Sequence, residues 1–284
     1  MIAITGATGH LGQLTIHALL GRGAAPQDIV ALVRDPQKAE ALAALGVQVR
    51  RADYKQPETL KAALEGVDRL LLVSSNDFED RVGQHRRVVE AAQQAGVTLL
   101  AYTSILRADT SGLSLAADHQ ATEELIRASG LPFVFLRNSW YMENYNPAQA
   151  VQHGVVAGSA GEGRVSAAAR ADYAAAAAAV LTGPGHENAV YELGGDQAFT
   201  LTELAAEVQA QSGRPVAYQN MPQDAYAQML RGVGVPDAVA DMLADSDVHL
   251  GQGDLYTESR DLSRLIGRPT TSLTEAVKAA LASS

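Results

Sequence analysis

The stretch MIAITGATGHLGQLTIHALL, residues 1–20, decides the fold. A short β-branched apolar run is followed by glycines at positions 6, 9 and 12 and then by apolar residues at helical spacing, so the order predicts a strand, a tight turn and a helix. Gly6 allows the turn, Gly9 leaves room for a ligand close to the backbone, and Gly12 lets the helix pack closely. The unpaired amides at the start of such a helix attract an anion, most often a pyrophosphate. Turn geometry alone is the alternative reason for the glycines.

Composition narrows the function classes. The chain has 284 residues, 47% of them hydrophobic, which is enough for a large domain with a smaller lobe. A net charge of −10 with scattered Lys and Arg argues against nucleic acid as a partner. Because there is no cysteine and the seven histidines show no paired ligand spacing, we expect no metal. The chain shows neither a signal-peptide layout nor an apolar run long enough to span a membrane, so we expect a cytoplasmic protein.

Apolar strand-like runs alternate with segments of helix length over the first 138 residues. We expect strands at residues 2–4, 29–33, 47–51, 69–74, 98–104 and 133–136. This repetition predicts an α/β fold, a doubly wound parallel sheet of the Rossmann type. Asp35 and Pro57 are typical of helix starts, as is the capping box of Thr200 with Glu203.

The rest of the chain predicts one more helix on the sheet and a smaller lobe. The alanine-rich segment 169–183 is strongly helix-forming, with Asp172 as its expected cap and the alanines at 174–179 indicating close packing. We assign residues 1–138 and about 165–193 to a dinucleotide-binding domain. Residues of about 139–164 and 194–284 form the expected C-terminal substrate lobe, which closes over a ligand at the carboxyl ends of the strands.

The end of the second strand indicates which dinucleotide binds. In IVALVRDP the strand ends at Arg34, and the following Asp35 is explained as a helix cap. An Asp or Glu at the strand end binds the ribose of NAD, whereas an Arg suits the 2′-phosphate of NADP. NADP is therefore the expected cofactor, and an exposed arginine beside a turn is the alternative.

Several segments together resemble the NmrA-like branch of the atypical short-chain dehydrogenases. They are ITGATGHLG, VRDP, LLLVSS, AYTS, HQATEELIRASG and LRNSWYMENY, and the resemblance extends over nearly the whole chain. It implies an NADPH-dependent enzyme that transfers two electrons, as a hydride from the nicotinamide, to a small quinone. It leaves a homodimer possible.

The resemblance also implies site residues. It places the pyrophosphate on Gly6, Ala7, Thr8, Gly9, His10 and Leu11, and the 2′-phosphate on Arg34. It places the adenine beside Ala52 and Asp53, and the ribose and nicotinamide along Ser74, Ser75, Asn76, Thr103 and Ser104. The reactive end of the cofactor would meet the substrate at Asn138, Trp140, Tyr141, Glu143 and Asn144. Structural roles are the alternative: a turn for Asp53, a strand end for Ser74 and Ser75, and ordinary core packing for Trp140.

The catalytic Tyr-x-x-x-Lys pair of the wider dehydrogenase group is absent. Leu115 stands at about the place of the tyrosine and His119 at about that of the lysine. Reduction of a ketone needs that proton donor, whereas a quinone gives a delocalised hydroquinone anion that water can protonate. We therefore expect Asn138 and Tyr141 to donate hydrogen bonds to the acceptor and His119 to contribute weakly. A surface histidine capping a helix is the alternative for His119.

Two other functions remain open. One is a redox sensor that binds NADP without turnover and regulates a partner protein. The other is a reductase of a different conjugated acceptor, such as a dye or an imine. The missing Tyr and Lys suit the sensor as well as the quinone reductase.

Overall fold

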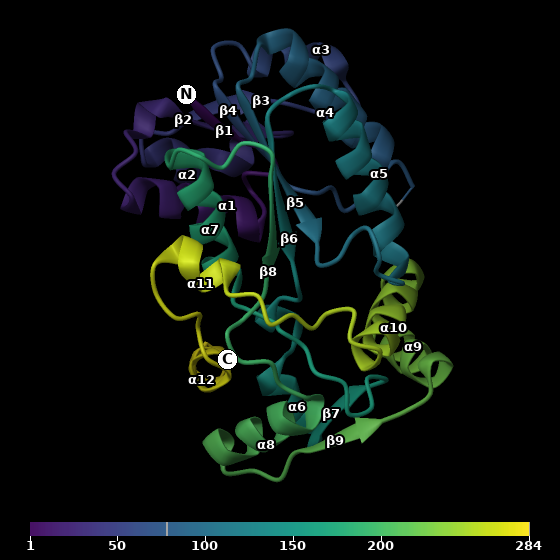
Figure 1. Ribbon diagram of the computed structural model, residues 1–284. Helices are drawn as coiled ribbons and strands as arrows, with labels where there is room; N and C mark the ends of the chain where they lie inside the picture. The colour runs from purple at the N-terminus through teal and green to yellow at the C-terminus, as the bar shows by residue number, and fades with distance from the viewer. Residues whose placement is uncertain (78, 284) are drawn as a thin grey trace.

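A sheet of seven parallel strands runs through the computed structural model, which describes residues 1–77 and 79–283 (Figure 1). The strand order β3-β2-β1-β4-β5-β6-β8 places the first glycine turn at the middle of the carboxyl edge, and it confirms the doubly wound parallel fold. The strands are β1 (Ile2–Ile4), β2 (Ile29–Val33), β3 (Gln48–Arg51), β4 (Arg69–Leu72), β5 (Leu99–Ile105), β6 (Phe133–Asn138) and β8 (Ala189–Leu193).

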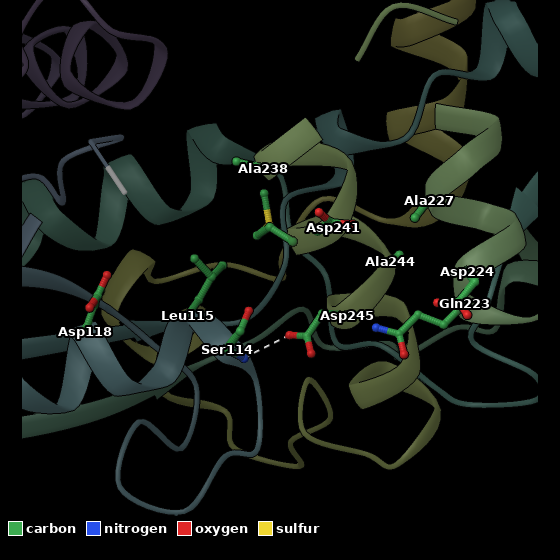
Figure 2. A pocket seen from close by; sticks show the side chains of 11 residues that line it. Ser114, Leu115, Asp118, Gln223, Asp224, Ala227, Ala238, Asp241, Ala244 and Asp245 are labelled. Carbon is green, nitrogen blue, oxygen red and sulfur yellow. Dashed lines mark hydrogen bonds between the residues drawn. The ribbon is translucent and has the colours of Figure 1, made fainter. Parts of the chain in front are cut away.

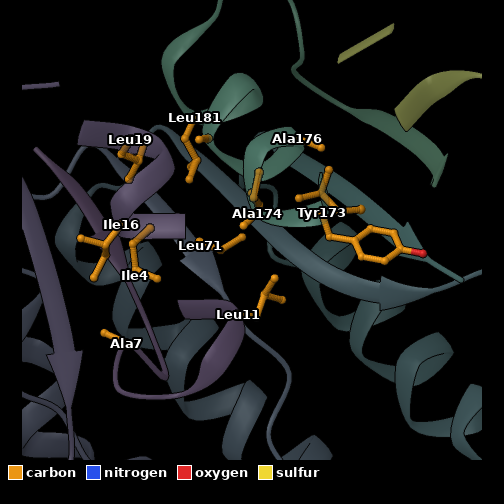
Figure 3. Close-up of a cluster of buried hydrophobic side chains, with 14 of the residues drawn as sticks. Ile4, Ala7, Leu11, Ile16, Leu19, Leu71, Tyr173, Ala174, Ala176 and Leu181 are labelled. Atoms are coloured by element: carbon orange, nitrogen blue, oxygen red, sulfur yellow. The ribbon is translucent and has the colours of Figure 1, made fainter. Parts of the chain in front are cut away.

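Helices cover both faces of this sheet. On one face lie α1 (His10–Gly21), α2 (Glu40–Ala44), α7 (Arg170–Thr182) and α11 (Asp261–Ile266); on the other lie α3 (Pro57–Ala63), α4 (Arg81–Ala95) and α5 (Ser114–Ala128). Figure 3 shows the first of the two cores, where Ile16 of α1 and Ala174 of α7 gather near Leu71 of the sheet. Each fully buried side chain of the size of Leu or Ile contributes roughly 1.5–3 kcal/mol, so these two cores stabilise the sheet and its carboxyl edge.

The alanine-rich helix α7 packs closely on α1, as its composition predicts, because small buried residues let two helices approach each other. The expectation that Asp172 caps this helix is wrong. Ala169 holds the N-cap position, while Asp172 lies in the first turn and is fully buried. Its carboxylate accepts hydrogen bonds from the Arg268 guanidinium at 2.7 Å and the Thr271 amide at 2.8 Å. These partners lie about a hundred residues away, where a local pattern cannot reveal them.

The structure also differs from the expected strands at β8, β6 and β4. The strand β8 was not predicted, and β6 continues to Asn138 where the sequence suggested an end at residue 136. Both differences have one cause, because Arg137 pairs with Glu192 and Asn138 pairs with Leu193 in the β6–β8 ladder. Asn138 is therefore the last residue of a strand and is held on both sides. By contrast, β4 ends at Leu72, before the predicted residue 74.

The local helix signals are confirmed. The carboxylate of Asp35 accepts a hydrogen bond from the amide of Gln37 and caps the short helix η2 (Pro36–Ala39). Pro57 occupies the first position of α3. Thr200 and Glu203 form a reciprocal capping box at the start of α8 (Leu201–Ser212). Each of these signals lies within four residues of the start of its helix, so the local sequence was sufficient to predict where the helix begins.

A smaller lobe lies beyond the carboxyl ends of the strands (Figure 1). It contains a parallel pair, β7 (Val155–Gly158) and β9 (Ala217–Asn220), and a separate hydrophobic core around Trp140, Phe199 and Leu250. Its helices are η3 (Met142–Asn144), α6 (Pro147–His153), α8, α9 (Gln223–Gly232), α10 (Asp237–Gly251) and α12 (Leu273–Ala282). The short helix η1 (Pro26–Asp28) precedes β2.

One segment assigned to the lobe by sequence packs against the large sheet instead. Helix α11 contacts α7 and β8, and its Leu262 is fully buried in the core beneath α1 and α7. The division of the chain into two domains stays a prediction. Within residues 1–77 and 79–283, no helix has the length and apolar character that a membrane crossing requires. The same residues contain no cluster of three or more side chains suited to binding a metal.

A buried carboxyl group in the lobe leads to a stability prediction. Asp247 on α10 is 7% exposed and accepts a hydrogen bond from the Ser159 amide at 2.8 Å. Burial raises the pKa of Asp247 to about 6 from 3.8. A folded-state pKa above the unfolded value means that the group favours folding at low pH and that this contribution is lost as the pH rises from about 4 through 6.

Asp247→Asn is therefore expected to raise the free energy of unfolding at neutral pH by about 1–3 kcal/mol, since the amide keeps the acceptor and carries no charge. Urea titrations at several pH values measure this effect, and the variant should show a flatter stability profile between pH 4 and 6. A variant that is less stable than the wild type at neutral pH would contradict the expectation.

Candidate active site

The glycine turn between β1 and α1 has a separate geometric reason for each glycine. Gly6 has φ +57°, a left-handed conformation that favours glycine. A Cβ atom on Gly12 would lie 2.8 Å from the Cα of Ala7 and even closer to the carbonyl oxygen of Gly6. Only glycine at position 12 therefore lets α1 start so close to the turn.

Gly9 is different because its surroundings are open. A Cβ atom built on Gly9 would meet only the carbonyl oxygen of Gly6, at 3.2 Å, and the residue is exposed. It is the N-cap of α1, no side chain in the described chain caps the helix there, and the first turn holds no acidic residue. The first amides of α1 are thus available to an anion. This cradle fits the pyrophosphate of a dinucleotide.

The other residues of the turn contribute mainly their backbone. Ala7 is fully buried and Leu11 is 8% exposed, both in the core under α1. The Thr8 carbonyl accepts a hydrogen bond from the Gln13 side chain at 2.8 Å, and His10 is exposed. The structure brings all six predicted residues of this turn together; that they bind pyrophosphate stays a prediction.

Arg34 lies exposed at the end of β2, beside the glycine turn. Among the described residues, its guanidinium takes part in no hydrogen bond or ion pair, while the neighbouring Asp35 is occupied as a helix cap. At the end of the adjacent β3, Ala52 is buried and donates its amide to the Val33 carbonyl at 2.8 Å. Asp53 accepts hydrogen bonds from the Lys55 amide and the Gln56 side chain. An unpaired cation at this position fits a 2′-phosphate.

Most hydroxyl groups of the residues that follow β4 or end β5 form hydrogen bonds within the protein. The Ser75 hydroxyl donates to the Gln84 side chain at 2.7 Å, and the Thr103 hydroxyl accepts from the Ser74 amide at 2.9 Å. Ser104 donates to Glu123 at 2.7 Å. In the part of the chain that the structure describes, the side chains of Ser74 and Asn76 make no hydrogen bond, so they remain available to a ligand.

Asn138 and Tyr141 form the centre of the predicted reactive end. The Asn138 amide nitrogen donates to the Tyr141 hydroxyl at 3.4 Å, and the residue is 4% exposed. The Asn138 Oδ1 atom is buried and has no hydrogen-bond partner within residues 1–77 and 79–283. An unsatisfied buried carbonyl oxygen costs roughly 1–3 kcal/mol, which a ligand donor would recover. Burial raises the pKa of Tyr141, so its hydroxyl stays protonated at neutral pH.

Arg170 is a residue that sequence reasoning missed. Its guanidinium lies 4.9 Å from the centre of the Tyr141 ring and donates to the Asn144 side chain at 2.9 Å. Its amide donates to the Glu143 carboxylate at 2.9 and 3.1 Å, so Glu143 caps α7. The predicted Glu143 and Asn144 thus both hold Arg170 against Tyr141. Trp140 packs in the lobe core and its carbonyl accepts from the Tyr173 hydroxyl.

A buried ionic network behind Asn138 was missed as well. Arg137, 4% exposed, pairs with Glu123 of α5 at 2.7 Å and with Glu192 of β8 at 2.9 Å. The network joins β6, β8 and α5 one residue before Asn138. Removing one partner of such a buried pair costs roughly 3–5 kcal/mol, so it fixes the strand end. Its partners lie 14 and 55 residues from Arg137 in the sequence, so no local pattern signals the network.

His119 is neither exposed nor a helix cap. It lies in the middle of α5, is 7% exposed, and its Nδ1 atom is 2.7 Å from the Tyr102 hydroxyl. Burial and the nearby Arg81 lower the pKa of His119 to about 3, so the ring is neutral at pH 7. The surface-cap alternative is therefore wrong. A catalytic part for His119 stays a prediction.

A pocket of about 540 Å³ lies between α5, α9 and α10 (Figure 2). It combines apolar side chains, among them Leu115 and Met242, with four carboxylates. In Figure 2, Ser114 at the start of α5 donates its amide to Asp245 of α10, at 2.9 Å. None of the predicted site residues lines the pocket, but Leu115 is the residue at the missing tyrosine's place. The four carboxylates belong to Asp118, Asp224, Asp241 and Asp245.

Comparisons with known proteins agree over the whole chain. A model of the NmrA-like family matches residues 1–280. Quinone oxidoreductase 2 of Escherichia coli K12 is 54% identical over 279 residues, covering 98% of this chain and 97% of that protein. The crystal structure of the NADPH-dependent quinone oxidoreductase of E. coli in complex with NADPH matches with a TM-score of 0.96 and 52% identity, covering 99% of this chain and 100% of the other. Triphenylmethane reductase of Citrobacter sp. in complex with NADP(H) matches with a TM-score of 0.94 and 40% identity, covering 99% and 100%.

Proposed function

Because the chain belongs to the NmrA-like family, we propose that it is an NADPH-dependent oxidoreductase that reduces quinones to hydroquinones by two-electron transfer. The observation that carries the proposal is the 54% identity over nearly the full length to a quinone oxidoreductase. The geometry supports the cofactor part of the proposal, because the residues expected to bind a dinucleotide lie together along the carboxyl edge of one sheet.

Several residues would hold the cofactor. The open space at Gly9 and the amides of α1 suit the pyrophosphate, and the unpaired Arg34 suits the 2′-phosphate. The carbonyl oxygen of Asn138, which lacks a partner among the described residues, suits a donor at the nicotinamide end. When bound there, NADPH supplies a hydride, that is two electrons and one proton, to the acceptor.

The residues of the chain align the acceptor with the cofactor and determine where the remaining proton comes from. Overall, quinone, NADPH and one solvent proton give hydroquinone and NADP⁺. The Tyr141 hydroxyl is a neutral donor, held by Asn138 and covered by Arg170, that stabilises negative charge developing on the quinone oxygen. His119 is neutral and engaged with Tyr102, so we assign the final protonation to water. Water is a sufficient proton donor because the negative charge of the hydroquinone anion is delocalised.

The deciding experiment follows the absorbance of reduced nicotinamide in a mixture of the purified protein, NADPH and a simple benzoquinone. The expected result is loss of the absorbance with hydroquinone as product in equal amount. NADPH binding without turnover would overturn the quinone reductase and support a redox sensor.

Reduction of a cationic conjugated dye is a second candidate function. The 40% identity to a triphenylmethane reductase favours it. The same assay with a cationic triphenylmethane dye distinguishes the two. A higher kcat/KM for the dye than for benzoquinone would make dye reduction the preferred activity.

Arg34→Glu is expected to weaken NADPH binding by about 10–100-fold, because it removes a charge-assisted contact worth roughly 1.5–3 kcal/mol and adds a like charge. NADH, which lacks the 2′-phosphate, should lose far less affinity. Titration calorimetry with both cofactors measures the difference, and Arg34→Gln is the neutral control. Equal weakening of NADPH and NADH would show that Arg34 does not bind the 2′-phosphate.

A further inference from the structure

Ser75, in the segment after β4, is held by three side chains of one helix. Its amide donates to His85 Nε2 at 2.9 Å, its carbonyl accepts from Arg81 Nε at 2.8 Å, and its hydroxyl donates to Gln84 Oε1 at 2.7 Å. The three partners share one face of α4, at positions i, i+3 and i+4. They are almost fully buried, with His85 0%, Gln84 4% and Arg81 6% exposed.

The hydrogen bonds of His85 select one tautomer of its ring. The Thr122 hydroxyl donates to the Asp118 carbonyl at 2.8 Å, so it accepts from Nδ1–H of His85, which lies 2.9 Å away. Nε2 then carries the lone pair that accepts the Ser75 amide. Burial and Arg81 lower the pKa of His85 to about 3, so the neutral form is kept at pH 7. The imidazole is a rigid link from α5 to Ser75.

The segment held in this way borders the cofactor site. Its first residue, Val73, donates its amide to the Thr5 hydroxyl at 2.9 Å and lies 3.7 Å from where a Gly6 Cβ would be. The Ser74 amide donates to Thr103 of β5 at 2.9 Å. Segment 73–76 thus runs between the glycine turn and the end of β5. A buried polar side chain destabilises the folded state unless it is hydrogen-bonded. Three such side chains of α4 form hydrogen bonds with the same residue, Ser75.

We propose that His85 is a positioning residue of the cofactor site, which fixes the backbone at Ser75 so that segment 73–76 keeps the shape that NADPH binds. The inference rests on the proposed function, because it assumes that the dinucleotide lies along this segment. His85 touches neither cofactor nor acceptor and acts only through Ser75, with Thr122 holding its ring in place.

Two amide substitutions test the two hydrogen bonds of the His85 ring separately. In His85→Gln the side-chain oxygen reaches the place of Nε2 and keeps an acceptor for Ser75, whereas in His85→Asn the shorter amide keeps only the link to Thr122. Loss of one hydrogen bond of about 1.4 kcal/mol corresponds to about tenfold in affinity. We expect His85→Asn to raise the dissociation constant for NADPH by ~10-fold or more and His85→Gln by less than ~3-fold.

The readouts are the dissociation constant for NADPH by calorimetry, and kcat and the quinone KM at saturating NADPH. The quinone KM should stay near the wild-type value in both variants. Val88→Ala is the matched control, since Val88 is fully buried on the same helix and has no contact with Ser75 among the described hydrogen bonds. It should lower the melting temperature and leave NADPH affinity unchanged. Thr122→Val, which removes the second support of the ring, should weaken NADPH binding in the same direction and replaces His85→Asn if that variant does not fold.

The outcomes separate this inference from the proposed function. Wild-type NADPH affinity in His85→Asn, or equal weakening in Val88→Ala, overturns the positioning role alone. A wild-type protein that binds NADPH but reduces no quinone overturns the proposed activity and leaves the affinity comparison valid. A wild-type protein that does not bind NADPH overturns both.

Discussion

Gly9→Val is expected to abolish NADPH binding while leaving the fold intact. The backbone of Gly9, with φ −78° and ψ 163°, is extended and suits valine. The added Cβ meets one atom, the Gly6 carbonyl oxygen at 3.2 Å, and the rest of the side chain fills the space open to a pyrophosphate. Loss of two charge-assisted hydrogen bonds of roughly 1.5–3 kcal/mol each weakens binding by about 100-fold or more. Titration calorimetry measures the affinity.

The same helix offers a matched control for this prediction. A Cβ on Gly21, at the far end of α1, has no neighbour within 4 Å, so Gly21→Ala should preserve both fold and affinity. Circular dichroism and a melting curve test that Gly9→Val remains folded. Unchanged NADPH affinity in a folded Gly9→Val protein would mean that the glycine turn is only a turn.

The sequence was most informative where a signal and its consequence lie close together. The glycine turn, the positions of strands β1 to β6 along the chain, and the helix starts at Asp35, Pro57 and Thr200 all follow from neighbours a few residues apart. Parallel strands buried on both faces are continuous apolar runs, which is why they stand out in a sequence.

The sequence was least informative for polar residues whose partners are distant. Asp172 accepts hydrogen bonds from the segment 268–271, whereas its sequence context predicts a helix cap. His119 is buried against Tyr102, whereas its sequence context allowed a surface residue. The edge strand β8 was missed because only Leu193 of its five residues is buried, so it is not a continuous buried apolar run, and because its pairing with β6 joins segments about fifty residues apart.

The same distinction applies to the candidate site. The positions of Gly9, Arg34 and Asn138 at the carboxyl edge were predictable, because parallel strands align their ends. The internal use of the hydroxyls of Ser75 and Ser104, and the stacking of Arg170 on Tyr141, depend on contacts between α4, α5 and α7 and their neighbours. Such contacts have no local sequence pattern. The residues that we expect to contact a ligand were thus easier to place on the sheet edge than the residues that support them.

Asn138→Ala is expected to reduce quinone turnover by ~10²–10³-fold, because it removes a preorganised polar group at the reactive end. Asn138 ends β6 between β5 and β8, so its side chain is held at the sheet edge. Its amide nitrogen holds the Tyr141 hydroxyl and its buried oxygen has no partner in the described structure. Alanine loses both functions. The effect should appear mainly in kcat, since the proposed cofactor contacts at Gly9 and Arg34 are unchanged.

The contrast with His119 makes this prediction specific. His119→Ala leaves the Tyr102 hydroxyl without its partner, so it should lower stability by roughly 1–3 kcal/mol, yet turnover should fall by less than about tenfold, below the ~10²–10⁴ of a general acid. Steady-state kcat and KM with NADPH and one benzoquinone, measured below the melting temperature of each variant, give the comparison. The Asn138→Asp side chain has nearly the same shape but carries a charge. This variant should turn over quinone as slowly as Asn138→Ala, because an ionised carboxylate repels the developing oxyanion. A collapse of kcat in His119→Ala beside near-normal turnover in Asn138→Ala would reverse the assignment and make the α5 histidine the proton donor.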